Sequence, residues 1–266
     1  MTRADTEGGL YPALLKYWRR RKGLSQLDLA LAAGVSARHV SFLETGRASP
    51  SREMVLRLGA TLGVPLREQN AMLVAAGFAE EFSEAEGLPP AIERALSRML
   101  AQQEPYPMVV MNRLYRVLRL NGAAEKLLAR FVAEPAALAP PVNVLDMVLD
   151  PRLCRPFIQD WEHVARDVLG RLHRESLANP ADADLSALLE SAFRHPDVPE
   201  SLRHPDFSRP SEATLAFRVR RGDLAMGFLT TLTVFSAPQN VTLDELRIES
   251  YFPLDEATER ECQRQG

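Results

Sequence analysis

"SQLDLALAAGVSARHVSFLETGR", residues 25–47, predicts two short helices joined by a tight turn. Ser25 is a favourable N-cap for the first helix, and Asp28, three residues later, gives that start the pattern of a capping box. Gly34 tolerates the left-handed backbone at which a helix ends. Ser36 then caps the second helix. The stretch therefore has the start and stop signals of two helices separated by a very short turn.

Three more short helices flank this pair. The segment "LLKYWRRRKG" (14–23) precedes it, and two segments follow, one opening at Ser51 and one at Pro65, where proline is tolerated in the first turn. Apolar residues recur at helical spacing and are assigned to a core: Val40, Leu43, Leu58 and Leu62. We predict an all-α domain of five helices over residues 1–78. The basic cluster at 19–22 is typical of a solvated helix end and is also able to bind phosphate.

The composition indicates a globular protein with an uneven charge. The chain has 266 residues, 46% hydrophobic and 25% charged, which predicts more than one domain. Residues 1–80 hold 11 Lys and Arg against 7 Asp and Glu, whereas the rest hold 21 against 28. A basic front and an acidic remainder suit an anion-binding first domain on a body that does not bind anions.

Cysteine use and the N-terminus bear on location. Cys154 and Cys262 lie far apart in no metal-ligand spacing, so a disulfide framework is not expected and a reducing cytoplasm is the simplest location. The start "MTRADTEGGLYPALL" lacks the apolar core of a signal peptide, and no run approaches a membrane span. We expect a cytoplasmic protein with no membrane partner.

Beyond residue 78 the pattern changes. Residues 79–104 are predicted to form a linker and a connecting helix, 105–256 a second domain, and 257–266 a tail. Two β-like runs occupy 108–121, a long amphipathic helix is expected over 152–178, and a second helix over 183–194. The fold class is α+β.

A hairpin is the clearest β signal. The segment "TLAFRVRRGDLAMGFLTTLTVF" (214–235) alternates around Gly222-Asp223, and 246–252 reads as a further strand. With that turn, three cross-strand pairs are predicted on one apolar face: Val219 with Met226, Phe217 with Phe228, and Leu215 with Thr230. An antiparallel sheet with helices on one side is the arrangement of a PAS-like domain.

The opening stretch also satisfies what a helix-turn-helix needs to read DNA. Ala30 and Ala33 are small enough for the second helix to cross the first, and that helix would present its outer face to the major groove. The face comprises Ser36, Ala37, Arg38, Ser41 and Phe42. Arginine can bind guanine, serine either base, and alanine or phenylalanine a thymine methyl group. Three further residues are assigned to the DNA backbone or to bracing a base contact: Gln26, His39 and Arg47.

Residues 10–77 resemble the helix-turn-helix of the XRE, or phage-repressor, family. The shared pattern comprises Gln26, Ala30, Gly34, Val35-Ser36, Val40, Leu43-Glu44, Gly46-Arg47, Pro50-Ser51 and Leu58. The resemblance implies a five-helix DNA-binding domain that works as a homodimer on double-stranded DNA with a near-palindromic operator.

Residues 100–255 resemble the MmyB-like ligand-binding domain, which commonly follows an XRE domain. The match rests on Pro107, on "VLRLN" ending at Asn121, and on "DPRLCRPFIQDWEHVARDVLGRLHRES" (150–176). It implies a PAS-like fold that binds a small apolar or fatty-acid-like molecule, with no other cofactor. Arg119 replaces a small residue of the family pattern, which changes the polarity expected near the pocket.

The proposed pocket lies between helix and sheet. Its candidate residues are Leu118, Asn121, Phe157, Trp161, Val164, Phe217, Val219, Met226 and Phe228. The same apolar residues could instead fill a packed core, and Asn121 could cap a helix rather than bind a ligand. If the core is filled, the second domain would serve only dimerisation or a protein partner.

An enzyme with an appended DNA-binding domain is the remaining alternative. The sequence contains none of GxSxG, a P-loop or GxGxxG, and His163 and His173 lack the spacing of a helical metal pair. Two "RHPD" segments place His195 and His204 near Asp197 and Asp206, in turn-like contexts. Cys154 beside Arg155 is read as a structural thiol. We expect no catalytic residues and no metal site.

Overall fold

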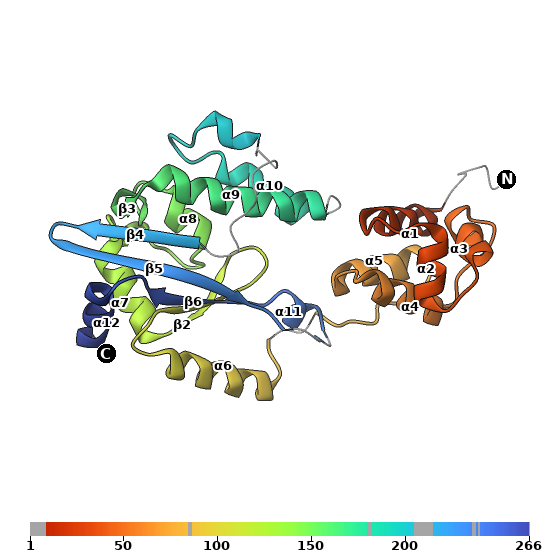
Figure 1. Ribbon diagram of the computed structural model, residues 1–266, viewed down its shortest axis with the longest axis horizontal. Helices are drawn as coiled ribbons and strands as arrows, with labels where there is room; N and C mark the ends of the chain where they lie inside the picture. The colour runs from red at the N-terminus through yellow and green to blue at the C-terminus, as the bar shows by residue number, and fades with distance from the viewer. Residues whose placement is uncertain are drawn as a thin grey trace. The chain divides into compact units, whose positions relative to one another are not determined.

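The computed structural model describes residues 9–84, 87–179, 182–204, 215–235, 238 and 240–265. The chain divides into two compact units (Figure 1). The smaller unit, called the head, takes residues 1–87 together with 236–244. The larger unit, called the body, takes residues 88–235 and 245–266. Among the described residues, no helix combines the length and the apolar character that a membrane crossing requires.

The first part of the head is helical as predicted. Its helices are α1 (Leu10–Arg21), α2 (Gln26–Ala33), α3 (Ala37–Glu44), α4 (Arg52–Leu62) and α5 (Leu66–Ala75). Ser25, Ser36 and Ser51 each accept a hydrogen bond from a backbone amide three residues on, so each caps its helix as the sequence indicated. Gly34 ends α2 with φ of +66°. The predicted core residues Val40, Leu43, Leu58 and Leu62 are all fully buried.

Two segments outside these helices complete the head. Asn70 of α5 accepts hydrogen bonds from the amides of Glu81 and Phe82 and donates one to the Phe82 carbonyl, so the chain after α5 stays bound to that helix. The short helix α11 (Val241–Asp244) also packs against α5. This return of a distant segment to the head was not anticipated from the sequence.

The body is built on a curled antiparallel sheet. Its described strands are β1 (Met108–Met111), β2 (Val117–Leu120), β3 (Ile158–Gln159), β4 (Leu215–Arg221), β5 (Leu224–Thr233) and β6 (Arg247–Pro253), in the order β2-β1-β6-β5-β4-β3. The predicted hairpin register is confirmed, because Val219, Phe217 and Leu215 pair with Met226, Phe228 and Thr230. Gly222 supplies the positive φ, +59°, that the turn requires. Thr214, the first residue of the predicted hairpin, lies outside the described residues.

Helices cover both faces of the sheet, and not one side only as the sequence led us to expect. One face meets α7 (Gly122–Phe131), α8 (Val144–Leu149) and α9 (Trp161–Ala178), while α10 (Ala183–Ala192) packs against α9 (Figure 1). The other face meets α6 (Pro90–Gln103), whose Glu93 and Ser97 hold Arg119 of β2. That contact explains the position of Arg119, which points away from the interior. One-turn 3-10 helices occur at Pro135–Ala137, Arg155–Phe157 and Glu200–Arg203.

Two predicted elements differ from the structure. The helix expected over 152–178 begins only at Trp161, since Pro156 interrupts the pattern and Asp160 has φ of +51°. Residues 155–159 instead form a 3-10 turn and strand β3. The expected tail is a helix, α12 (Glu256–Gln265), whose Thr258 and Cys262 are buried against the sheet.

Candidate DNA interface and ligand cavity

A buried ion pair fixes the predicted recognition helix α3 in the head. Arg19 of α1 donates to both carboxylate oxygens of Glu44, at 2.5 and 2.9 Å, and also to the Leu24 carbonyl at 2.7 Å. Gln26 donates to the same carboxylate at 2.8 Å. Side chains from α1 and α2 therefore hold the C-terminal end of α3, leaving its opposite face free.

The electrostatics of Glu44 follow from these contacts. Burial raises the pKa of its carboxyl group, but hydrogen bonds from Arg19 and Gln26 outweigh burial, so the net pKa is below the ordinary value. The carboxylate is charged at neutral pH and balances the guanidinium of Arg19. Because both charges are satisfied, the pair can be buried without an uncompensated charge.

The predicted base-reading residues lie together on α3 and at its start. Ser36 and Arg38 are exposed, and Ala37, Ser41 and Phe42 are partly exposed. The guanidinium of Arg38 lies 5.1 Å from the centre of the Phe42 ring, in cation–π geometry. Within the described residues it makes no hydrogen bond or ion pair, so its donors are available to a ligand.

The three residues assigned to the backbone have different surroundings. His39 is partly exposed on α3, and Arg47 is exposed in the turn after it. Gln26 is only partly exposed, and its amide nitrogen is already used by Glu44. Its side-chain oxygen remains the group that could meet DNA directly.

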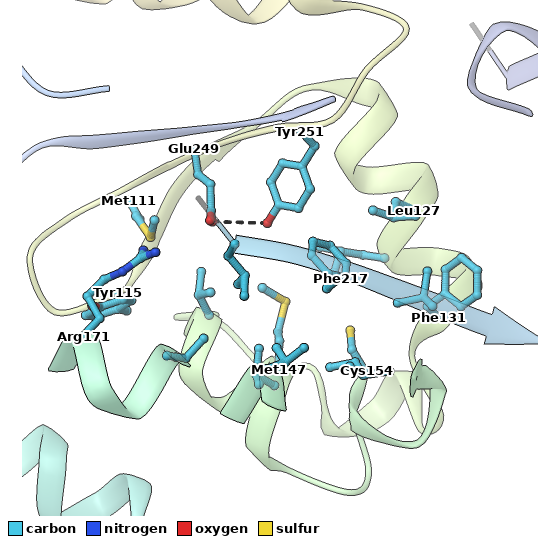
Figure 2. A pocket seen from close by; sticks show the side chains of 18 residues that line it. Met111, Tyr115, Leu127, Phe131, Met147, Cys154, Arg171, Phe217, Glu249 and Tyr251 are labelled. Atoms are coloured by element: carbon cyan, nitrogen blue, oxygen red, sulfur yellow. Dashed lines mark hydrogen bonds between the residues drawn. The ribbon is translucent and has the colours of Figure 1, made fainter. Parts of the chain in front are cut away.

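The body contains an apolar cavity of about 110 Å³ between the sheet and α7, α8 and α9 (Figure 2). Its apolar walls are formed by Met111, Leu127, Leu128, Phe131, Val144, Met147, Val148, Cys154, Ile158, Val164, Val168, Leu215, Phe217 and Val219. An apolar cavity of about 150 Å³ can hold a molecule the size of benzene. The volume therefore matches a compact apolar group.

Polar groups meet the cavity from β6 and α9. Glu249 and Tyr251 point from β6, with the Tyr251 hydroxyl donating to Glu249 at 3.3 Å (Figure 2). Burial raises the pKa of Glu249 above its ordinary value, although the nearby charge of Arg171 lowers it in part. Arg171 of α9 also lines the cavity, and within the described part of the chain it has no hydrogen bond or ion pair. The cavity thus has a carboxyl group whose pKa is raised by burial, a phenol and an available cation.

The structure brings only some of the predicted ligand-binding residues to this cavity. Val164, Phe217 and Val219 line it. Met226 and Phe228 lie on the same face of the sheet but are buried with Cys262 of α12. The other predicted aromatic residues, Phe157 and Trp161, pack outside the cavity.

Specific contacts account for those aromatic positions. Phe157 packs edge-on against Phe131, whose own ring lines the cavity. The Trp161 nitrogen donates to the Val148 carbonyl at 2.7 Å, and its ring lies under Arg155 at 3.7 Å. Both residues therefore support the wall from behind.

The remaining two predictions also need correction. Leu118 is 48% exposed and does not line the cavity; it lies between Val117 and Arg119, at the irregularity in the pairing of β2 with β1. Asn121 is buried, caps α7 by accepting from Ala124, and also accepts from Met108 and donates to Tyr106. These contacts are those of a helix cap, the alternative role that the sequence offered for Asn121.

Sequence reasoning missed the polar groups of the cavity. Arg247, Glu249 and Tyr251 alternate along β6 on one face, and Glu249 pairs with Leu232 and Val109. The signal that could have revealed them is a glutamate at an inward-facing position of a central strand. Arg171 could not be distinguished in the sequence from the other arginines of α9.

The described residues contain no group of three or more His, Cys, Asp or Glu side chains able to hold a metal ion. His195 is bound to Asp146 at 2.9 Å. Asp206, named with it in the sequence, lies outside the described residues. Cys154 lines the cavity wall, and burial raises the pKa of its thiol to about 12, which keeps it protonated.

Comparison with protein families assigns both units. The helix-turn-helix family model matches residues 15–69. The model described as "MmyB-like transcription regulator ligand binding domain" matches residues 92–264. The chain belongs to the MmyB-like transcription regulators. This regulator therefore combines a DNA-binding helix-turn-helix of the XRE type with a ligand-binding domain, as the sequence predicted.

Comparisons with individual proteins add little to the regulator's description. No curated protein matches it. A solved structure, "Structure of an RNA-binding Light-Oxygen-Voltage Receptor", is similar with a TM-score of 0.28 and 13% identity. The match covers 97% of this chain and 62% of that chain, so the regulator spans less than two thirds of its length.

Proposed function

We propose that this regulator binds a near-palindromic DNA site as a homodimer and changes that binding when the body takes up a small, largely apolar molecule. The observation that carries the sensing role is the apolar cavity with Glu249, Tyr251 and Arg171 on its surface. A domain used only for dimerisation would have no need of an available cation beside such a cavity. The response would work in the cytoplasm, where the operator is.

The DNA contacts are assigned by chemistry. Arg38 has unoccupied donors suited to guanine, Ser41 can bond either base, and Phe42 or Ala37 can meet a thymine methyl group. Ser36 lies with them on the base-facing side, and His39, Arg47 and the free oxygen of Gln26 would fix the register through the backbone. Two copies are proposed because a single helix contacts too few base pairs to select one operator, and half-sites about 34 Å apart match a symmetric dimer.

The cavity chemistry defines the ligand. A compact apolar body, such as one aromatic ring or a short branched chain, matches the volume better than an extended acyl chain does. Arg171 is a cation on the cavity surface, and burial raises the pKa of Glu249, which weakens that carboxyl group as a partner for Arg171, so an anionic head group is favoured. Tyr251 can add a hydrogen bond to such a head group.

The ligand can be sought directly. Native mass spectrometry of the regulator purified from its source should show a bound small molecule released on denaturation. Calorimetry with three ring-matched probes then tests the head group: phenylacetate, phenylacetamide and phenethylamine. We expect phenylacetate to bind tightest and Arg171→Met to remove its advantage over the amide.

A matched control is Leu118→Ala, which changes an apolar residue outside the cavity and should leave probe binding unchanged. Absence of both a co-purified molecule and any probe binding would contradict the sensing role and favour a body used for dimerisation or a protein partner.

A further inference from the structure

We infer that the connection from β5 to β6 couples the two units: α11 is built into the head, β6 carries the Glu249–Tyr251 side of the cavity, and Asp244 and Glu245 join them. This inference rests on the proposed function, since it assumes that the cavity is where the signal enters. It names the route by which ligand binding in the cavity would affect the DNA-binding helices.

The head end of the route is a helix cap supplied from a distance. Helices α2, α3 and α4 are each capped by a serine that directly precedes them. Helix α5 is preceded by Pro65, which provides no side-chain cap. Asp244 of α11 takes that role, its Oδ2 accepting from the Leu66 amide at 2.9 Å. A carboxylate at this position also complements the positive end of the helix dipole.

Other contacts hold α11 in the head. The Val241 amide donates to the Ser83 carbonyl at 3.1 Å, and Asn240 caps α11 by accepting from Leu243 at 2.8 Å. Val241 and Leu243 are buried. Helix α11 is therefore a fixed part of the head and not a loose loop passing over it.

The body end begins at the next residue. Glu245 pairs with Arg113, which also binds Asp182 at the start of α10. Two residues later, Arg247 pairs with Glu175 of α9 at 3.0 Å. Glu249 and Tyr251 follow at the same two-residue spacing and face the cavity.

The two sets of contacts are adjacent along the chain, at Asp244 and Glu245. Glu245 and Arg247 are paired with charged side chains of the body, Glu249 and Tyr251 face the cavity, and Asp244, the residue before Glu245, is bonded to α5. No unanchored segment separates the two sets of contacts. A shift of β6 on ligand uptake is then transmitted along these contacts to the Asp244 cap.

The test compares three amides of the head that each donate to a helix cap. Leu66, Asp28 and Met54 each donate to a capping side chain, but only the acceptor of Leu66 comes from the β5–β6 connection. In the full-length protein, Val168→Phe fills the cavity without any ligand. We expect hydrogen exchange at Leu66 to change by about fivefold or more, and at Asp28 and Met54 by less than twofold.

The specificity of the route is tested by two cap removals. In Asp244→Ala, DNA affinity should no longer respond to Val168→Phe, whereas Ser51→Ala, which removes an equivalent cap inside the head, should keep the response. Equal changes at all three amides, no change at Leu66, or a persistent response in Asp244→Ala would overturn the proposal. Val168→Leu provides a milder filling if the phenylalanine variant does not fold.

The design separates this inference from the proposed function. Cavity filling acts without a ligand, so an effect at Leu66 would support coupling even if phenylacetate bound nowhere. Conversely, phenylacetate binding with no effect at Leu66 would support sensing and reject this route.

Discussion

Arg19 and Glu44 form a two-pronged ion pair that joins α1 to the end of α3, with Nη2 and Oε2 2.9 Å apart. Their side chains are only 10% and 2% exposed. The pair thus holds the end of α3, the proposed recognition helix, against α1 through two buried side chains.

Glu44→Gln should destabilise the head by about 3–5 kcal/mol, because it leaves the Arg19 charge buried without its counter-ion. Urea unfolding measures the loss. The exposed pair formed by Glu53 and Arg57 is the matched control, and Glu53→Gln should cost under about 0.5 kcal/mol. Similar costs for the two variants would show that burial of the pair is unimportant.

The same residue predicts an acid response. The pKa of Glu44 is lower in the folded state than its ordinary value near 4.5. Its contribution to stability is therefore present above that value and is lost as pH falls through the folded pKa. Unfolding measured from pH 6 to pH 3 should show a steeper decline for the wild type than for Glu44→Gln.

Glu249 predicts the opposite sign. Its pKa is raised by burial, so its contribution to stability is present below about 4.5 and is lost as pH rises toward the folded pKa. Relative to the wild type, Glu249→Gln should gain stability as pH increases from 4 to 8. Thermal unfolding across this range tests it, and a constant difference between the two proteins would mean that Glu249 ionises normally.

Arg38→Ala should weaken binding to a selected operator by about 1–3 kcal/mol and relax the preference at one base position. Arg47→Ala should weaken binding to all sequences alike and reduce the salt dependence by about one charge. Binding measured on a library of single-base operator variants distinguishes the two. A uniform loss for Arg38→Ala would reassign that residue to the DNA backbone.

Asn121→Ala should destabilise the body by about 3 kcal/mol, since it removes a helix cap and leaves buried backbone groups near Met108 and Tyr106 without partners. Urea unfolding gives the value, and Asn121→Asp, which keeps the acceptors, should cost less. Probe affinity of the folded Asn121→Ala fraction should equal that of the wild type. A selective loss of affinity would restore Asn121 to the ligand site.

The sequence predicted the head closely because its signals are local. Serine caps, the left-handed glycine at position 34 and helical spacing each act within four residues, and the structure reproduces them. The hairpin was equally accessible, because a turn at Gly222 fixes the register of every pair that follows. The long helix over 152–178 was overextended because apolar spacing continued through Pro156.

The cavity was harder to predict because its surface is assembled from distant elements. A two-residue period placed Phe217 and Val219 inward, yet the same period includes Met226 and Phe228, which α12 covers. Periodicity identifies a face and not the part of it left open. Arg171 and Glu249 belong to the site only because α9 crosses that face, which no local pattern encodes.

The chain passes between the two units at three places, at 87/88, 235/236 and 244/245. A fragment ending near residue 84 would therefore lack Asp244 and expose the start of α5, so it is a trimmed version of the head and not an independent module. A chimera that replaces the sensing domain of this regulator by a single splice in the linker would also replace α11, because α11 follows the linker in the chain although it packs in the head. A faithful exchange must move residues 240–244 together with the helices on which they lie.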